Sequence, residues 1–279
     1  MSENQQKTSQ ENTHKPRVLS IVNQKGGVGK TTTTVNLATA LAAVGKKVLV
    51  IDFDPQGNAS TGLGIENNNR EITSYDVVLN DTATSQAIQK TAVPNLHVIP
   101  ATIDLSGAEI EMVSLVRREF RLKDALANAP EQYDYILIDC PPSLGLLTLN
   151  ALTASNSVLI PLQCEFYALE GLSHLVKTIE LVKANLNSAL NIQGIVLTMY
   201  DRRNKFTEQI EGDVRGYFGE LVYNAVIPRN IRMSEAPSHG KPALIYDMHC
   251  AGSKAYIQLA SELIKREKII KNQMQTEAA

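Results

Sequence analysis

Short apolar runs rich in valine, leucine and isoleucine recur along the chain, and more polar segments separate them. Such runs are typical of strands buried on both faces, as in a parallel sheet that helices cover. We predict strands at residues 17–22, 47–54, 96–101, 133–139, 157–162, 192–199 and 222–227.

The segments between these runs carry apolar residues three and four positions apart, which is the spacing of a helix with one buried face. After the first run, Val35, Ala38 and Leu41 follow this spacing, and Gly45 ends it as a glycine commonly ends a helix. Further helices are predicted at residues 105–128, 169–184, 207–217 and 252–271. This alternation predicts an α/β fold with one mainly parallel, twisted sheet and helices on both faces.

The helix predicted at residues 105–128 is amphipathic. Its expected core residues are Ile110, Val113, Leu115, Val116, Phe120 and Leu122. We expect its charged residues to form a solvated face rather than a site, namely Arg117, Arg118, Glu119 and Arg121. Residues 57–92 are rich in Gly, Asn, Thr and Ser and predict loops with short helices.

The chain of 279 residues is 43% hydrophobic, enough for one substantial core in a single α/β domain. We assign that domain to residues 17–271. Residues 1–16 predict a disordered tail, because they hold too little apolar surface to offset the entropy of ordering. An interaction arm is the alternative for this segment. Residues 272–279 predict a flexible C-terminal tail.

The net charge of −2 gives no global electrostatic reason to bind nucleic acid or membrane, so any basic surface must come from arrangement in the fold. Cys140, Cys164 and Cys250 are few and odd in number, which suits reduced thiols rather than a disulfide framework. No apolar run is long enough to span a bilayer, and no signal-peptide core is present. We therefore expect a cytoplasmic protein.

A glycine-rich turn, residues 23–32, joins the first predicted strand to the first helix. Glycines let backbone N–H groups converge on a phosphate chain, and the helix N-terminus adds its positive end. Lys30 can reach the terminal phosphates, and the hydroxyl of Thr31 can hold Mg²⁺. The turn therefore predicts a nucleotide-binding loop made of Lys25, Gly26, Gly27, Val28, Gly29, Lys30, Thr31 and Thr32.

Two predicted strands end in aspartates. The strand at 47–54 ends in Asp52 and Asp54, and the strand at 133–139 ends in Asp139. Residues past the carboxyl ends of parallel strands line the ligand crevice, so Asp54 could orient a water at the γ-phosphate. A capping or turn role is the alternative for both Asp52 and Asp54. Asp139 is in the Walker B position, where an acid holds the shell of Mg²⁺.

The loop departs from the usual pattern G-x-x-x-x-G-K-[ST], because Gln24 replaces its first glycine and Lys25 adds a second lysine. The run Lys-Gly-Gly-Val-Gly-Lys-Thr-Thr resembles the deviant Walker A loop of the ParA/MinD class of P-loop ATPases. That resemblance implies ATP and Mg²⁺ as cofactors and a homodimer in the ATP state, in which Lys25 reaches the nucleotide of the partner subunit. It also implies that Lys25, Lys30 and Asp54 serve catalysis, and that Thr31 and Asp139 hold the metal.

Two later segments also resemble ParA, Tyr-Asp-Arg-Arg-Asn-Lys at 200–205 and Pro-Arg-Asn-Ile-Arg at 228–232. The resemblance implies that Pro228 and Asn230 pack around the adenine, and that Arg203 and Arg232 lie on a surface that binds double-stranded DNA without sequence preference. Solvated loop arginines are the alternative. The implied protein is a ParA (Soj)-type partitioning ATPase, nucleoid-associated and stimulated by a ParB-type centromere-binding protein.

Two related activities are alternatives to this interpretation. A MinD-type division-site ATPase acts on membrane, but the residues after the last predicted helix lack the apolar face of a membrane-binding helix, so no stable membrane association is expected. An iron–sulfur redox protein needs well-placed cysteine pairs, and Cys140 directly follows Asp139. The five histidines show no metal-ligand spacing, so we expect no zinc site. We expect Cys140 to be a packed small residue rather than a nucleophile.

Overall fold

The computed structural model describes residues 15–127 and 132–277, with side chains as far as residue 269. Within these residues the strands form one seven-stranded sheet in the order β3-β4-β2-β5-β1-β6-β7. Every pairing is parallel except that of the two-residue edge strand β3 with β4. The strand bounds are β1 Arg17–Ile21, β2 Val48–Asp52, β3 Gln89–Lys90, β4 Leu96–Ile99, β5 Tyr135–Asp139, β6 Ser157–Gln163 and β7 Asn191–Thr198. The predicted mainly parallel sheet is confirmed.

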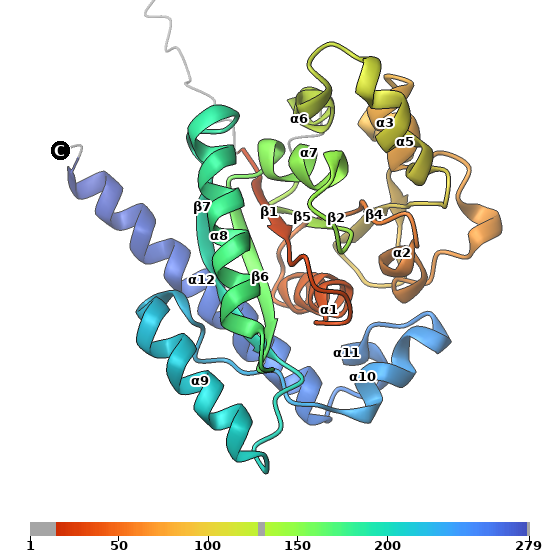
Figure 1. Ribbon diagram of the computed structural model, residues 1–279. Helices are drawn as coiled ribbons and strands as arrows, with labels where there is room; N and C mark the ends of the chain where they lie inside the picture. Colours follow the sequence, from red (N-terminus) through yellow and green to blue (C-terminus); the bar gives the residue numbers. More distant parts are fainter. Residues whose placement is uncertain (1–14, 128–131, 278–279) are drawn as a thin grey trace, which may run out of the picture.

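Helices cover both faces of the sheet, and each face has its own hydrophobic cluster. In Figure 1, α8 lies in front of the sheet and α12 passes behind it. One cluster joins the sheet to α1 Lys30–Ala43, α2 Asn58–Gly62, α10 Ile231–Glu235, α11 Ala243–Tyr246 and α12 Ala251–Glu277. The other joins it to α3 Ser74–Leu79, α4 Thr84–Ala87, α5 Leu105–Glu111, α6 Arg121–Ala127, α7 Leu146–Ala154, α8 Ala168–Asn185 and α9 Lys205–Phe218.

The register of the central strands brings the loops after β1, β2 and β5 together. Ile21 of β1 and Asp52 of β2 both stand opposite Asp139 of β5. These strands run in the same direction, so their following loops leave from one edge of the sheet. In a doubly wound sheet, the ligand crevice lies at this edge.

The strand predicted at residues 222–227 is wrong. The segment runs beside β7 and donates only two backbone hydrogen bonds to it, from Tyr223 N to Ile195 O and from Ile227 N to Leu197 O, each 2.8 Å. Between them, the N–H groups of Asn224 and Ala225 donate to the carboxylate of Glu262 in α12. A side chain thus takes the donors that a regular ladder would use.

The single helix predicted at residues 105–128 is also wrong. The chain leaves α5 at Glu111 and makes two short 3₁₀ turns before α6. Between the two turns Leu115 is extended and Arg117 has a left-handed φ of 57°, so a continuous helix cannot pass through this segment. Most of the expected core residues do not reach the core: Ile110, Val113, Leu115 and Val116 are exposed, and Phe120 is half-buried. Leu122 alone of that set is fully buried, and the core residues that replace the others are Leu105, Ala108 and Met112.

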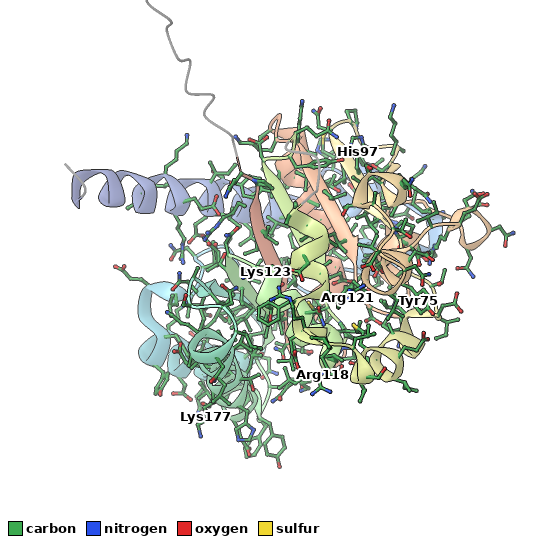
Figure 2. All side chains as sticks on the ribbon, turned by 90° about the horizontal axis from the view of Figure 1, so that it is seen from above. Tyr75, His97, Arg118, Arg121, Lys123 and Lys177 are labelled. Atoms are coloured by element: carbon green, nitrogen blue, oxygen red, sulfur yellow. The ribbon has the colours of Figure 1, made fainter. Side chains whose placement is uncertain are left out.

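Of the charged residues predicted to form a solvated face, Arg117 is exposed, whereas Arg118, Glu119 and Arg121 are half-buried. Figure 2 labels Arg118 and Arg121 among them. Arg117 pairs with Asp124, Arg118 with Glu119, and Arg121 with Asp81. Each cation is therefore balanced by a carboxylate of the same chain.

The C-terminal helix is longer than predicted, because α12 continues to Glu277 rather than ending near residue 271. Its Tyr256, Leu259 and Leu263 are buried against α1 and the sheet. No helix among the described residues combines the length and apolar character needed to cross a membrane. The predicted tail at residues 1–16 lies almost wholly outside the described residues.

Candidate functional site

The glycine-rich loop forms a turn that opens directly onto the N-terminus of α1. Gly27 and Gly29 adopt left-handed φ values of 75° and 86°, which glycine alone adopts without strain. Gly29 is the N-cap of α1, and no side chain caps this end of the helix. The first N–H groups of α1 therefore remain available to an anion, as a phosphate-binding loop requires.

Lys30 is buried beneath this turn, with 6% of its surface exposed. Its Nζ donates a hydrogen bond to the backbone carbonyl of Lys25 at 3.1 Å, which folds the side chain back over the loop. Burial lowers the pKa of Lys30, while the negative charges of Asp139 and Asp54 oppose this shift. The lysine is thus confined where a phosphate chain would lie along the loop.

Lys25 lies at the surface of the same turn, with its side chain about half exposed. Its Nζ pairs with the carboxylate of Glu165, in the segment that follows β6. The two lysines of the loop therefore differ: Lys30 is directed inward, and Lys25 is held at the rim by an acid of its own chain. The sequence analysis did not identify Glu165.

Asp139 combines full burial with one carboxylate oxygen that accepts no hydrogen bond from the described residues. It is fully buried at the end of β5, and its Oδ1 accepts a hydrogen bond from the Thr34 hydroxyl at 2.9 Å. Among the described residues, its Oδ2 has no hydrogen-bond partner. Burial and then the neighbouring Asp52 raise the pKa of Asp139 to about 8, and Thr31 acts against that rise. A buried carboxylate with a free oxygen beside a threonine hydroxyl fits a hard divalent cation or its water shell.

Asp52 and Asp54 have different surroundings. Asp52 is fully buried, and its Oδ2 accepts hydrogen bonds from the backbone N and the hydroxyl of Ser60, at 2.7 and 2.6 Å. These bonds fix the start of α2, which is the capping role considered for Asp52. Asp54 accepts one hydrogen bond, from Gln56 N at 3.0 Å. Its negative charge acts to raise the pKa of Lys30. Asp54 therefore faces the loop and stays a candidate for catalysis.

The end of β7 lies against the phosphate loop. Thr198 Oγ1 donates to Val28 O at 2.7 Å, which ties β7 to the loop. Pro228 forms an isolated bridge with Tyr200 just beyond β7. Asn230 is the N-cap of α10, and its Oδ1 accepts the N–H of Arg232 at 2.9 Å. Pro228 and Asn230 thus lie on the segment next to the end of β7, where the resemblance expects adenine contacts.

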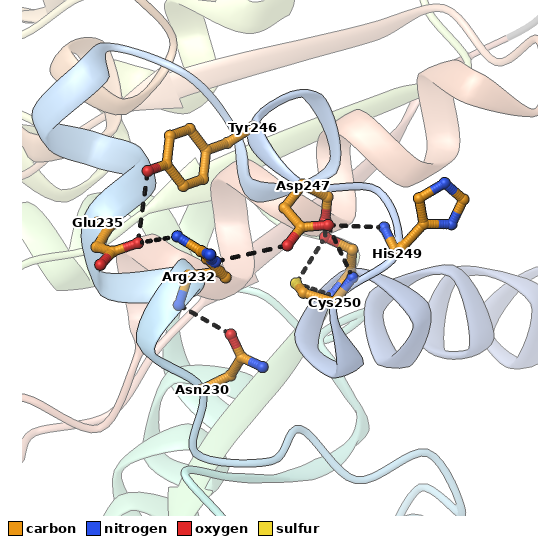
Figure 3. Close-up of polar contacts among 8 residues, drawn as sticks. Asn230, Arg232, Glu235, Tyr246, Asp247, His249 and Cys250 are labelled. Atoms are coloured by element: carbon orange, nitrogen blue, oxygen red, sulfur yellow. Dashed lines mark hydrogen bonds and ion pairs between the residues drawn. The ribbon is translucent and has the colours of Figure 1, made fainter.

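The two candidate DNA-binding arginines are exposed, and each is paired with an acid that the sequence analysis did not single out. Arg203 has 89% of its side chain exposed and pairs with Asp201 at 3.0 Å. Arg232 lies between Glu235, at 2.9 Å, and Asp247, at 3.6 Å (Figure 3). Asp247 is far from Arg232 in sequence, so only the fold reveals this contact.

The remaining predictions concern cysteine and histidine. Cys140 is fully buried, and burial raises the pKa of its thiol, which fits a packed residue and not a nucleophile. The part of the chain that the structure describes contains no group of His, Cys, Asp and Glu side chains that could together hold a metal ion. A cation held by Asp139, Thr31 and phosphate oxygens would not require such a group.

Comparisons with known proteins agree with this geometry. A family model described as an AAA domain matches residues 16–192. The chain is 61% identical over 256 residues to the chromosome partitioning protein ParA of Caulobacter vibrioides (strain NA1000 / CB15N), covering 90% of this chain and 95% of that protein. It is 56% identical over 247 residues to the sporulation initiation inhibitor protein Soj of Bacillus subtilis (strain 168), covering 88% of this chain and 98% of that protein.

A solved structure gives the same fold. The crystal structure described as cobyrinic acid a,c-diamide synthase from Mycobacterium smegmatis, with bound ATP analog and magnesium, superposes with a TM-score of 0.79. The two chains are 37% identical, and the superposition covers 91% of this chain and 96% of the other.

Proposed function

Since this chain belongs to the ParA/Soj family of chromosome-partitioning ATPases, we propose that it is itself a DNA-partitioning ATPase. It hydrolyses ATP to ADP and phosphate, slowly alone and faster with a ParB-type partner. The ATP-bound homodimer holds non-specific double-stranded DNA on the nucleoid, and hydrolysis releases it.

One observation carries this proposal: a buried lysine, a buried carboxylate with a free oxygen and an uncapped helix N-terminus meet at the edge of the sheet. The loop amides and Lys30 bind the phosphate chain of ATP, and Thr31 and Asp139 hold Mg²⁺. When bound, Mg²⁺ neutralises charge on the phosphate oxygens. Asp54 orients the attacking water, and Lys30 stabilises the charge that develops during transfer.

Lys25 supports the dimeric part of the proposal. A half-exposed lysine at the rim of the phosphate loop can reach a nucleotide bound by a second copy, and its pairing with Glu165 holds it on that outer face. The dimer loses this contact when hydrolysis removes the γ-phosphate, because a ligand shifts an equilibrium only by its differential affinity for the two states. Hydrolysis therefore favours separate subunits.

Arg203 and Arg232 support the DNA-binding part. Both guanidinium groups lie at the surface, where they can exchange their own carboxylates for phosphates of the DNA backbone. Contacts with phosphates carry no sequence information, and binding that depends on them weakens steeply with salt.

A gel shift with unrelated duplex DNA tests the proposal, run with ATP, with ADP and without nucleotide. We expect retention with ATP only, and its loss in Arg203→Glu and Arg232→Glu with unchanged ATP affinity. Arg117→Glu is the matched control, because Arg117 is also an exposed arginine in an ion pair but lies in the segment before α6. Lys30→Ala, which should not bind ATP, is the negative control.

Two results would contradict the proposal. Equal retention in all three nucleotide states would separate DNA binding from the ATP cycle. Full retention by both charge-reversed variants would remove Arg203 and Arg232 from the DNA surface.

The MinD-type alternative receives no support from the C-terminal helix. The apolar face of α12 is buried in the core against α1 through Tyr256, Leu259 and Leu263. These side chains are therefore not available to contact a lipid surface. Flotation with liposomes in the presence of ATP checks this point, and we expect the protein to stay in the unbound fraction.

A further inference from the structure

Exposed aromatic side chains gather at one place on this molecule. The chain has no tryptophan, 5 phenylalanines and 9 tyrosines. Among the described residues, the exposed aromatic side chains are Phe166 (73%), Tyr167 (68%), Phe206 (39%) and Tyr217 (77%). Phe166 pairs with two of the others: its ring stacks with that of Phe206, with centroids 6.4 Å apart, and Tyr167 meets it edge-on at 4.9 Å. We call Phe166, Tyr167 and Phe206 the aromatic ridge.

The ridge comes from two elements far apart in sequence. Phe166 and Tyr167 immediately precede α8, and Phe206 is in the first turn of α9. Phe166 and Phe206 both line a cleft of about 500 Å³, together with Met199, Arg203 and Arg229. Clustered rings that remain exposed beside a hollow are characteristic of the anchors of protein interfaces, which are enriched in aromatic side chains.

The ridge is continuous with the lysine that the proposed function places at a subunit contact. Glu165 directly precedes Phe166, lines the same cleft and pairs with Lys25 of the phosphate loop. The surface therefore carries an exposed acid and an exposed base within one ion pair, beside three exposed rings. Such a surface is complementary to itself: about a two-fold axis, the acid and base of one copy can face the base and acid of another.

We propose that the aromatic ridge and Glu165 form the surface on which a second copy of this chain is seated when nucleotide is bound. This inference rests on the proposed function, because it takes Lys25 to act across the dimer. The rings supply the apolar centre of the contact, and the charged pair lies at its rim. Aromatic anchors near the centre of an interface carry most of its binding energy, whereas an exposed ion pair contributes little.

The double variant Phe166→Ala/Tyr167→Ala tests the ridge, in sedimentation with a non-hydrolysable ATP analogue. We expect the dimer dissociation constant to rise at least about tenfold, as for the loss of interface anchors. The nucleotide affinity of the monomer should change by less than about twofold, because neither ring lies on the phosphate loop. Tyr217→Ala is the matched control: it removes an exposed ring at the other end of α9 and should leave the dimer unaltered.

Three outcomes would overturn the inference. An unaltered dimer in the double variant, with wild-type thermal stability, would place the ridge outside the interface. Weaker nucleotide binding by the monomer would make the ridge a stacking site for the base. Normal dimerisation with lost DNA retention would make it part of the DNA surface. A wild-type chain that stays monomeric with the analogue would instead contradict the proposed function itself.

Discussion

Asp52 and Asp54 stand two positions apart at the end of one strand, and hydrogen bonding separates their roles. Asp52 uses one carboxylate oxygen to accept both Ser60 donors and has no exposed surface. Asp54 accepts only the N–H of Gln56 at the edge of the phosphate site. Asp52 accepts hydrogen bonds on both carboxylate oxygens and is fully buried, so it is a poor candidate to orient water, and Asp54 stays the candidate for catalysis.

Replacing Asp54 by alanine should stop hydrolysis without preventing ATP binding. The reason is that Asp54 lies beside the loop and contributes no ligand to the phosphates in this scheme. We expect phosphate release to fall by at least about a hundredfold, the usual scale for loss of a group that activates the nucleophile. The ATP-bound dimer should accumulate in sedimentation, and normal turnover in this variant would remove Asp54 from its role.

The raised pKa of Asp52 predicts that the stability of the nucleotide-free protein depends on pH. Burial raises its pKa from 3.8 to about 6, so the folded chain keeps this proton to higher pH than the unfolded chain does. The contribution of Asp52 to stability is therefore full below pH ~4 and is lost as the pH rises through about 6. Asparagine does not ionise, so Asp52→Asn should gain stability relative to the wild type over this window, on the order of 1–3 kcal/mol.

Urea unfolding of the wild type and Asp52→Asn at several pH values between about 4 and 8 measures this effect. Any constant difference from altered hydrogen bonding to Ser60 does not depend on pH and cancels in the comparison. A stability difference that stays flat across the window would show that Asp52 is ionised in the folded chain from low pH.

At the scale of elements, the pairing of α1 with α12 supports the loop. α1 begins at the phosphate loop, and eleven of its 14 residues are buried. Thr33 and Tyr256 join the two helices through their hydroxyls at 3.1 Å, in a contact buried on both sides. The C-terminal helix therefore fixes the helix whose N-terminus forms the anion site.

Leu259→Ala should test this support. Leu259 is fully buried in the cluster that includes α1, and truncating such a leucine costs about 2–5 kcal/mol through lost burial and the cavity left behind. Ile257 on the same helix is 42% exposed and lies outside both core clusters, so Ile257→Ala should cost less than about 1 kcal/mol. Denaturant unfolding measures both, and equal costs for the two variants would refute the packing described for α12.

At the scale of the whole molecule, the proposed function assigns the two lysines of one loop to different subunits. Lys30 is enclosed by its own chain, and Lys25 is held outward by Glu165. An exposed ion pair contributes at most about 1 kcal/mol, so this contact can be exchanged for one with a nucleotide across the dimer. Under the proposed function, this exchange would couple self-association to nucleotide binding.

Lys25→Ala should weaken the ATP-dependent dimer at least about tenfold while leaving the first nucleotide contact in place, because a charged contact across an interface is lost twice in a symmetric pair. Lys46→Ala is the control, since Lys46 also pairs with a carboxylate but precedes β2, at the opposite edge of the sheet. Sedimentation with a non-hydrolysable ATP analogue measures the dimer. An unaltered dimer would show that Lys25 does not act across subunits.

The local pattern of the sequence determined the sheet, most of the helices and the phosphate loop. Continuous apolar runs form the central strands because both of their faces can be buried under helices. The glycines at positions 27 and 29 allow the left-handed φ values that the loop requires. Lys25, Lys30 and Thr31 could be proposed from the glycine-rich loop after a strand, and Asp54 and Asp139 from their places at strand ends.

Only the tertiary structure decided how distant segments meet. Residues 222–227 have the composition of a strand, but Glu262 of α12 takes their donors. Residues 105–128 have helical spacing, but the chain turns at Arg117. Glu165, Asp247 and the aromatic ridge carry no local signal, because their contacts are with residues far away in sequence. Periodicity reports which face a residue prefers within its own element, and long-range packing alone fixes what that face touches.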